Sequence, residues 1–243
     1  MKGKRRTSLT FRQILPNMIT SGNILCGMLA LVLVLHGKPG FAAWLVFMAV
    51  FFDFMDGKVA RSIGGSSAFG VELDSLADVV SFGVAPALIF YSSYLRDWLG
   101  VTGALVAAFF ALCGALRLAR FNVQHAEGSA FQGFPIPAAG LFLASLVMAG
   151  WKLPPAVAAV IALFMGLLMV SNVPYGNLKG LRKGNVNRHK SLFLLGLILT
   201  FIAFLKNAAP LASISIYLVS GFLRFDWANW LSRDGEDVAE QDL

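Results

Sequence analysis

The chain has 243 residues, of which 57% are hydrophobic and only 14% are charged, and its mean hydropathy is +0.71. Soluble domains of this size rarely have such a composition, so the sequence predicts a membrane protein. The formal net charge of +7 does not require a nucleic-acid partner, because basic residues also gather beside membrane helices on the cytoplasmic side.

Apolar stretches that are long enough to span a bilayer, about 20 residues each, predict eight membrane helices. They lie near residues 17–36, 40–61, 69–95, 99–121, 134–151, 153–173, 190–206 and 208–224. We therefore expect an all-α fold, a polytopic helical bundle that forms one transmembrane domain over residues 1–225. This domain divides into a core, 1–180, and two additional helices within 190–224. The tail 226–243 holds six of the thirteen acidic residues and is expected to be disordered.

The basic residues are distributed unequally between the two sides of this predicted bundle. With the N-terminus inside, sixteen of the twenty Lys and Arg residues fall on that side, and the other side receives only Lys38, Arg96, Lys152 and Lys206. Lys and Arg near helix ends favour the cytoplasmic side. We therefore expect both termini to be cytoplasmic and the protein to lie in a bacterial-type inner membrane. The first span has no small-x-small cleavage site after its basic start, so we expect it to be retained.

Four aspartates interrupt the second and third predicted helices: Asp53, Asp56, Asp74 and Asp78. At about 100° per residue, the first two share a helix face, and so do the last two. Small or basic residues occupy the same faces, namely Gly57, Ala60 and Arg61 on one helix and Gly70 on the next. All four acids lie within roughly 12 Å of the connecting loop, because a helix rises about 1.5 Å per residue. The pattern predicts a site between these two helices that opens to the cytoplasm.

Such a cluster of carboxylates needs a positive partner, since four like charges repel one another in a membrane. Arg61 alone cannot neutralise them, whereas one or two divalent cations could. Oxygen ligands without His or Cys favour Mg²⁺ or Mn²⁺. The alternative is a set of acids that are satisfied by hydrogen bonds within the bundle, which would explain one aspartate better than four. The small residues beside the acids leave room for a ligand, although they also permit close helix packing.

The spacing Asp53-x2-Asp56-Gly57-x2-Ala60-Arg61-x8-Gly70-x3-Asp74-x3-Asp78 resembles, at every position, the signature of the CDP-alcohol phosphotransferases. Those integral membrane enzymes join an alcohol to the phosphate of a CDP-linked donor and release CMP. The segments LPNMITSGNILCG, RLARFNV, FQGFPIPAAG and VSNVPYGNLK are similar to the membrane-embedded branch that uses CDP-diacylglycerol and serine. The resemblance implies phosphatidylserine synthesis from CDP-diacylglycerol and L-serine among membrane lipids, by a homodimer that binds no nucleic acid.

The resemblance also implies roles for individual residues. Asp53, Asp56 and Asp74 would hold two metal ions, with Asp78 as a further ligand, as the catalytic base, or as both. The nucleotide end of the donor would lie beside Asn17, Thr20, Gly57, Ala60, Arg61, Ser66, Ser67 and Gly70. Asn17 and Thr20 lie near the predicted start of the first helix, so they could instead be caps.

Basic and polar residues at the end of the fourth predicted helix form a second candidate group, Arg117, Arg120 and Asn122. We hypothesise that one arginine binds the serine carboxylate and the other a lipid phosphate, since both ligands suit a forked donor. The alternative is ordinary anchoring at the cytoplasmic surface. Lys179, in a basic loop, could attract an anionic lipid headgroup or could simply be solvated.

Two other functions remain open at this point. Intramembrane acids also mark ion paths, so the chain could be a divalent-cation transporter. An enzyme of the same fold could use a different alcohol, such as glycerol 3-phosphate, inositol phosphate or choline.

Overall fold

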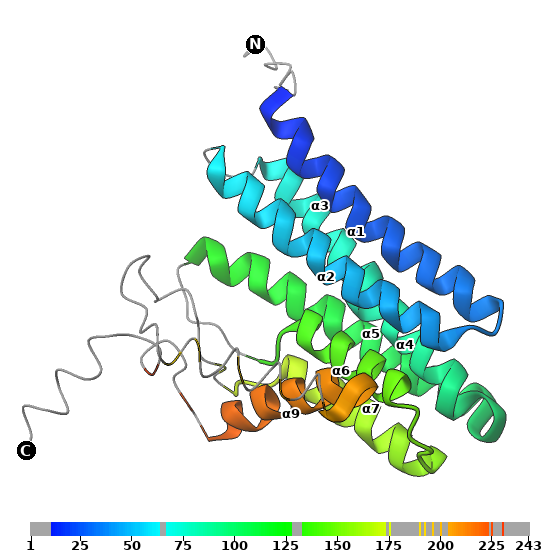
Figure 1. The fold of residues 1–243 in the computed structure, drawn as a ribbon. Coiled ribbons are helices and arrows are strands. Elements are labelled where there is room, and N and C mark those ends of the chain that lie inside the picture. The colour runs from blue at the N-terminus through cyan, green and yellow to red at the C-terminus, as the bar shows by residue number, and fades with distance from the viewer. Residues whose placement is uncertain are drawn as a thin grey trace, which may run out of the picture.

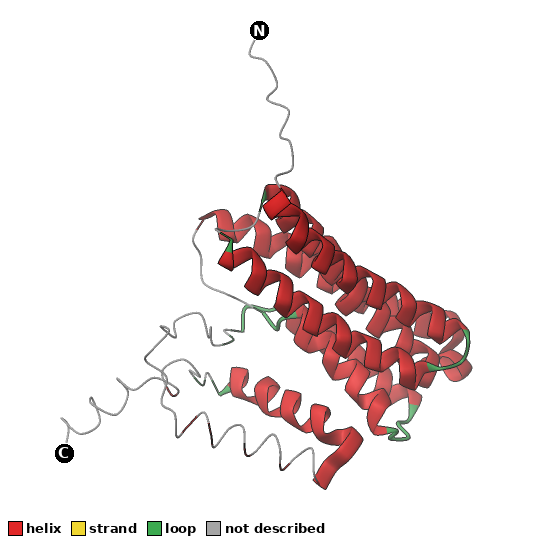
Figure 2. Cartoon of the chain, turned by 45° about the horizontal axis from the view of Figure 1, so that its top comes forward, coloured by secondary structure: helices red, strands yellow, loops and turns green. Residues whose placement is uncertain are grey.

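A computed structural model describes residues 11–63, 67–127, 133–173 and 204–223, together with positions 175, 190, 192, 196, 200, 225 and 230. Within these residues the regular structure is helical throughout and contains no strand, which confirms the all-α prediction (Figure 2). Ser66, Lys179, most of the predicted span 190–206 and nearly all of the tail 226–243 lie outside the described residues.

The first two helices form an antiparallel pair that supports the rest of the bundle (Figure 1). Helix α1 covers Phe11–Leu35 and helix α2 covers Pro39–Ser62. Gly37, whose φ is +70°, makes the tight turn between them, and Pro39 begins α2 in a position where its missing N–H is not needed. Helix α3, Ala68–Asp78, then packs against α1. The two acid-bearing helices are therefore both in contact with α1.

Helix α1 starts earlier than the sequence predicts, at Phe11 in place of residue 17, and it runs through Pro16. The predicted boundary was wrong because hydropathy marks the part of a helix that crosses lipid, and a helix can extend beyond that part into the interface. Asn17 and Thr20 therefore lie inside the helix and do not cap it. The Thr20 hydroxyl lies 3.0 Å from the Pro16 carbonyl one turn earlier, a contact that serine and threonine make in helix interiors.

The chain continues from α3 through a long helical run that turns back on itself. Two π-helical segments, η1 (Val79–Val84) and η2 (Tyr91–Leu95), flank helix α4 (Ala85–Phe90), and helix α5 follows over Arg96–Glu127. Gly100 has φ +47° and ψ −118°, which interrupts the helical path. Beyond it α5 packs back against η1 and η2. The predicted spans 69–95 and 99–121 thus correspond to the two arms of this run, while its π-helical segments had no counterpart in the sequence prediction.

The remaining described helices cover one side of this assembly. Helix α6 (Ile136–Ala149) packs on α2, helix α7 (Pro155–Val170) packs on α5, and helix α9 (Ala209–Phe222) packs on α6 after the short 3₁₀ segment η4 (Lys206–Ala208). Their bounds differ from the predicted spans by at most three residues at each end. Each of these three α-helices has a proline in its first turn, where proline is well tolerated.

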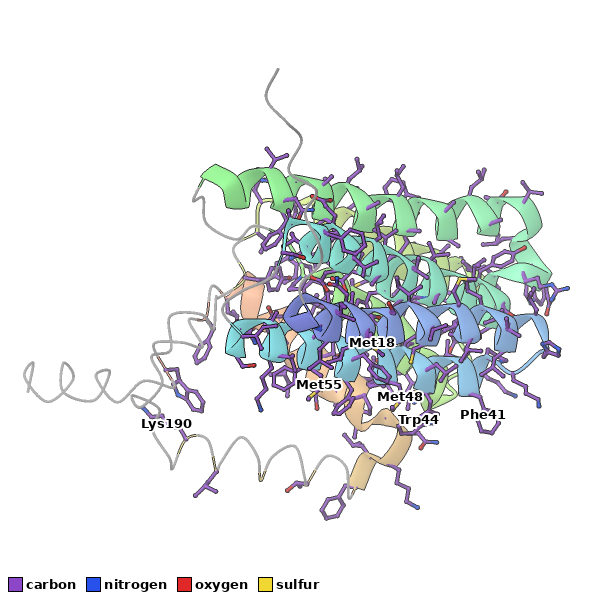
Figure 3. All side chains as sticks on the ribbon, turned by 90° about the horizontal axis from the view of Figure 1, so that it is seen from above. Met18, Phe41, Trp44, Met48, Met55 and Lys190 are labelled. Atoms are coloured by element: carbon purple, nitrogen blue, oxygen red, sulfur yellow. The ribbon has the colours of Figure 1, made fainter. Side chains whose placement is uncertain are left out.

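The composition and surface of the helices are those of a membrane protein. Three helical stretches of the described chain, Ile14–Leu35, Pro39–Ser62 and Ala68–Val123, are long and apolar enough to cross a bilayer, and α6 and α7 are shorter apolar helices. Large apolar side chains such as Met18, Phe41 and Trp44 project outward from α1 and α2 with more than half of their surface exposed (Figure 3). Lipid is the solvent in which such a surface is stable. The number of membrane helices, eight, stays a prediction.

Candidate active site

The acids predicted on two helices come together in the structure. Asp53 and Asp56 lie on α2 and Asp74 on α3, and one carboxylate oxygen from each lies within 4.8 Å of the other two. Asp78, at the end of α3, is buried and is close enough to interact electrostatically with all three. By contrast Glu72, which the helical period directs to the opposite face, is exposed.

This cluster fits a hard divalent cation. Asp74 Oδ1 is buried and has no hydrogen-bond partner among the described residues, so it is an acceptor for which this part of the chain supplies no donor. A buried polar atom of this kind is unfavourable unless something else satisfies it. Three carboxylates that converge without His or Cys form the donor set that suits Mg²⁺ or Mn²⁺. The alternative that hydrogen bonds alone satisfy the acids therefore does not account for Asp74.

Helix α1, which packs against both acid-bearing helices, supplies polar side chains to the acids. The Thr20 hydroxyl lies 2.6 Å from Asp56 Oδ2, and the Asn23 amide lies 3.4 Å from Asp78 Oδ1. Thr20 and Asn23 are three residues apart and thus share a helix face. Asn23 was not among the residues predicted from the sequence. The available signal was an Asn inside a predicted membrane span, because polar residues inside a membrane usually have a specific partner.

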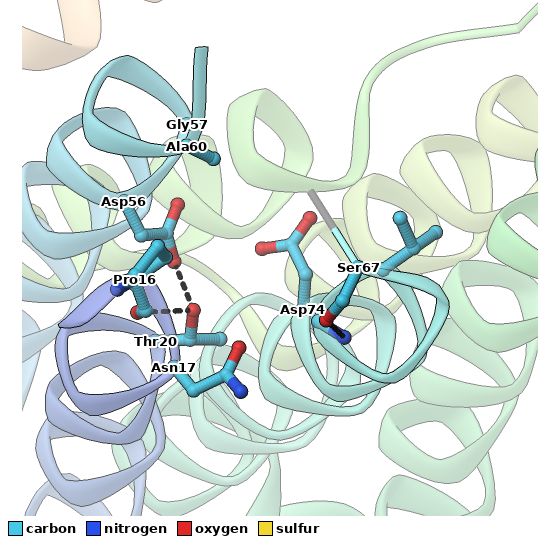
Figure 4. Close-up of a pocket in the computed structure, with 10 residues that line it drawn as sticks. Pro16, Asn17, Thr20, Asp56, Gly57, Ala60, Ser67 and Asp74 are labelled. Carbon is cyan, nitrogen blue, oxygen red and sulfur yellow. Dashed lines mark hydrogen bonds between the residues drawn. The ribbon is translucent and has the colours of Figure 1, made fainter. Parts of the chain in front are cut away.

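A cavity of about 70 Å³ lies between α1, α2 and α3 beside these acids (Figure 4). Asp56 and Asp74 line it. Six of the residues predicted to surround the nucleotide also line it: Asn17, Thr20, Gly57, Ala60, Ser67 and Gly70.

The small residues at the cavity differ in what lies against them. At Gly70 a Cβ atom would lie 3.0 Å from Asn17 Oδ1, so glycine lets α1 and α3 approach closely. Ser67 caps α3, since its hydroxyl accepts a hydrogen bond from the Gly70 N–H at 3.0 Å. At Gly57 the nearest atom to such a Cβ is Arg61 Nη1, at 3.4 Å, so the exposed Arg61 side chain lies over this glycine.

The basic and polar residues at the end of α5 differ in their contacts. Arg120 donates to the Val170 carbonyl at 3.2 Å and to Asn172 Oδ1 at 2.7 Å, which ties α5 to the end of α7. The Asn122 amide donates to Ser75 Oγ at 3.0 Å and so ties α5 to α3. These bonds hold the helices around the site in place.

Arg117, one turn before Arg120, is arranged differently. Its Nε is buried and has no hydrogen-bond partner within the described part of the chain, and its guanidinium lies 5.6 Å from the Phe121 ring centroid. It is close enough to interact electrostatically with Asp78 and with Tyr217 of α9. Of the two candidate arginines, Arg117 is thus the one with an unused donor beside the acids.

Residues 13–173 match the sequence profile of CDP-alcohol phosphatidyltransferases. The chain is 37% identical over 224 residues to a CDP-diacylglycerol–serine O-phosphatidyltransferase of Helicobacter pylori strain J99, covering 87% of this chain and 91% of that protein. It is 39% identical over 165 residues to the Bacillus subtilis protein of the same name, covering 68% of this chain and 91% of that one. An archaetidylserine synthase of Methanothermobacter thermautotrophicus is 38% identical over 183 residues, covering 74% and 76% of the two chains.

Proposed function

Because the chain belongs to the CDP-alcohol phosphatidyltransferase family, we propose that it transfers the phosphatidyl group of CDP-diacylglycerol to the hydroxyl of L-serine and releases CMP. Serine is the acceptor in the names of the relatives from Helicobacter pylori and Bacillus subtilis, and the archaeal relative is named for a serine lipid. The observation that carries the proposal is the convergence of Asp53, Asp56 and Asp74, at the spacing of the family signature, on one point between α2 and α3.

Asp53, Asp56 and Asp74 would hold the metal, which we propose to be two ions of Mg²⁺ or Mn²⁺. Bound divalent cations neutralise pyrophosphate charge and stabilise the departing phosphate of CMP. The buried Oδ1 of Asp74, which no donor of the protein satisfies, supports its place among the ligands.

Asp78 is the residue that we assign as the base. Transfer requires the serine oxygen to form a bond to the phosphorus of the phosphatidyl group while the bond from that phosphorus to the CMP oxygen breaks. The hydroxyl proton must leave in the same process, and a buried carboxylate beside the metal ligands can accept it. The Asn23 amide of α1 donates to Asp78 Oδ1 at 3.4 Å, so Asp78 also has a polar partner on the first helix.

The donor nucleotide would lie beside the cavity between α1, α2 and α3. Asn17 and Thr20 offer polar atoms there, and Gly57 and Ala60 leave the wall free of bulky side chains. Arg61, exposed and directly over Gly57, supplies a forked donor for a phosphate that enters from outside the cavity.

We assign Arg117 to the carboxylate of serine. Its buried Nε lacks a partner, and it lies near Asp78, so an amino acid bound by its carboxylate would bring its hydroxyl toward the base. A forked guanidinium binds a carboxylate with two parallel hydrogen bonds, which an ammonium group cannot do.

We expect Arg117→Lys to raise the KM for serine by about tenfold while the KM for CDP-diacylglycerol stays within about twofold, since one charge-assisted hydrogen bond contributes roughly 1.5–3 kcal/mol. Steady-state CMP release with each substrate varied in turn measures both constants. Arg120→Lys is the matched control, because Arg120 already bonds to Val170 and Asn172. It should lower thermal stability and leave the serine KM nearly unchanged. Equal effects of the two substitutions would contradict the assignment.

The placement of the site in the membrane is also part of the proposal. Serine and the released CMP are charged and water-soluble, so we place the acids near the cytoplasmic ends of α2 and α3. Both termini would then be cytoplasmic and the bundle would lie in the inner membrane, where it would act as a homodimer. The positive-inside distribution of Lys and Arg supports this orientation.

A single assay tests the proposed function. Purified protein in detergent is incubated with CDP-diacylglycerol, Mn²⁺ and one alcohol at a time, and CMP is measured. Serine should support release of CMP, and glycerol 3-phosphate, inositol phosphate and choline should not. Release with another of these alcohols but not with serine would show that the acceptor is a different alcohol, while the activity would still be that of the family. No release with any alcohol would contradict the proposal.

A further inference from the structure

Asn23 of α1 occupies a fixed position against the segment that carries Asp78. Its side chain is fully buried. The amide Nδ2 donates to Asp78 Oδ1 at 3.4 Å, and the backbone carbonyl of the same residue accepts a hydrogen bond from Ser81 Oγ at 2.9 Å. One turn further along α1, a Cβ atom at Gly27 would lie 2.5 Å from Ser81 Oγ, so the two segments are in close contact. Asn23 can move little relative to Asp78.

Packing alone does not explain an asparagine at this position. Asn23 Oδ1 is buried and finds no hydrogen-bond partner among the residues that the structure describes, which is unfavourable in a membrane interior. A leucine of nearly the same shape would fill the space without that cost. Within the described residues, the one polar interaction of the side chain is its bond to Asp78, so this bond is the feature that leucine could not supply.

The backbone around Asp78 directs both residues that contact Asn23, Asp78 and Ser81, toward α1. Asp78 is the last residue of α3, and the π-helical segment η1 begins directly after it, with the Ala85 N–H bonded to the Val80 carbonyl five residues earlier. Asp78 and Ser81 are three residues apart and both contact Asn23. Single π-helical turns inside α-helices are frequent at functional sites.

We propose that Asn23 is a positioning residue that orients the Asp78 carboxylate for proton transfer from the acceptor alcohol, an inference that rests on the proposed function. By donating to Oδ1, the amide restricts rotation of the carboxyl group and leaves Oδ2 for the acceptor hydroxyl. Thr20 acts in the same way one turn earlier, where its hydroxyl contacts Asp56 Oδ2. Helix α1 thus orients one carboxylate on each acid-bearing helix. Groups that orient ligands and catalytic carboxylates in this manner affect activity by about 10–100-fold.

Asn23→Leu tests the proposal because it keeps the shape and removes the donor. We expect kcat to fall by about 10–100-fold. The KM for CDP-diacylglycerol should stay within about twofold, as should the dissociation constant for Mn²⁺ measured by electron paramagnetic resonance without substrate. The thermal midpoint should stay close to that of the parent, since the unsatisfied Asn23 Oδ1 is removed while Asp78 Oδ1 loses its donor. A variant that is slower but no less stable and binds metal normally is not what a structural role would produce.

Ser81→Ala is the matched control, because it breaks the hydrogen bond from Ser81 of η1 to the Asn23 carbonyl and keeps the bond between Asn23 and Asp78. It should keep kcat within about twofold of the parent, because the close backbone contact at Gly27 still holds α1 against η1. Asn23→Ala serves as a second variant, since it opens space for a water that can donate to Asp78, and it should recover part of the turnover that Asn23→Leu loses.

Three results would overturn the inference: full turnover in Asn23→Leu, equal losses in Asn23→Leu and Ser81→Ala, or weaker Mn²⁺ binding that accounts for the loss. If the parent protein releases CMP with a different alcohol, the acceptor assignment fails, and the same comparison made with that alcohol still tests Asn23.

Discussion

Asp74→Asn is expected to lower the rate of CMP release by about a thousandfold or more at saturating CDP-diacylglycerol and serine. The substitution keeps the shape of the side chain and removes one negative ligand from the cluster that Asp53 and Asp56 complete. A bound divalent ion contributes several kcal/mol of transition-state stabilisation, and about 4 kcal/mol corresponds to a thousandfold in rate. Steady-state release of CMP over a range of Mn²⁺ concentrations measures the loss, and direct Mn²⁺ titration should show weaker binding.

The thermal stability of the same variant, with and without Mn²⁺, distinguishes a metal site from a structural cluster of acids. Without metal, the three convergent carboxylates repel one another, so Asp74→Asn should unfold at the same or a higher temperature than the parent in a chelator. Added Mn²⁺ should stabilise the parent more than the variant, because a ligand stabilises the state that binds it. Glu72→Gln on the exposed face of α3 is the control and should change neither property. Unchanged Mn²⁺ affinity in Asp74→Asn would contradict the assignment.

The position of the acid cluster could be predicted because it depends on local geometry. Helical periodicity puts Asp53 with Asp56 and Asp74 with Asp78, and a short connection forces the two helices to be neighbours. Six residues predicted to lie near the nucleotide line the same cavity in the structure. That agreement concerns their location, and their binding roles remain proposals.

The features that sequence reasoning missed depend on contacts between distant segments. The sequence does not show that Asn23 meets Asp78, which is 55 positions away. Nor does it distinguish Arg117 from Arg120, since the difference lies in whether the last residue of α7 offers a carbonyl, and Asn172 just after it an amide oxygen, to the side chain. The π-helical segments after Asp78 depend on how η1 packs between α1 and α6, and periodicity cannot reveal them. The early start of α1 was missed for another reason, because the membrane boundary was taken as the end of the helix.

Asp78→Asn is the variant that decides how the proton leaves the acceptor. We expect kcat to fall by about 10²–10⁴-fold, the usual contribution of a positioned general base. Asparagine keeps the size of the side chain and can still meet the Asn23 amide through its own carbonyl oxygen, so α1 should stay in place. The KM for CDP-diacylglycerol and the Mn²⁺ dissociation constant should remain close to those of the parent, because Asp53, Asp56 and Asp74 are intact.

Each outcome of this experiment assigns Asp78 to one role. A loss of turnover with normal binding of Mn²⁺ and of CDP-diacylglycerol identifies the base. A loss that high Mn²⁺ concentrations restore would instead make Asp78 a metal ligand. Full turnover would show that Asp78 takes no part in the chemistry, and in that case the effect of Asn23→Leu on kcat should also disappear. In the double variant Asn23→Leu with Asp78→Asn, the first substitution should therefore have almost no further effect on kcat, because a positioning residue can act only through the group that it positions.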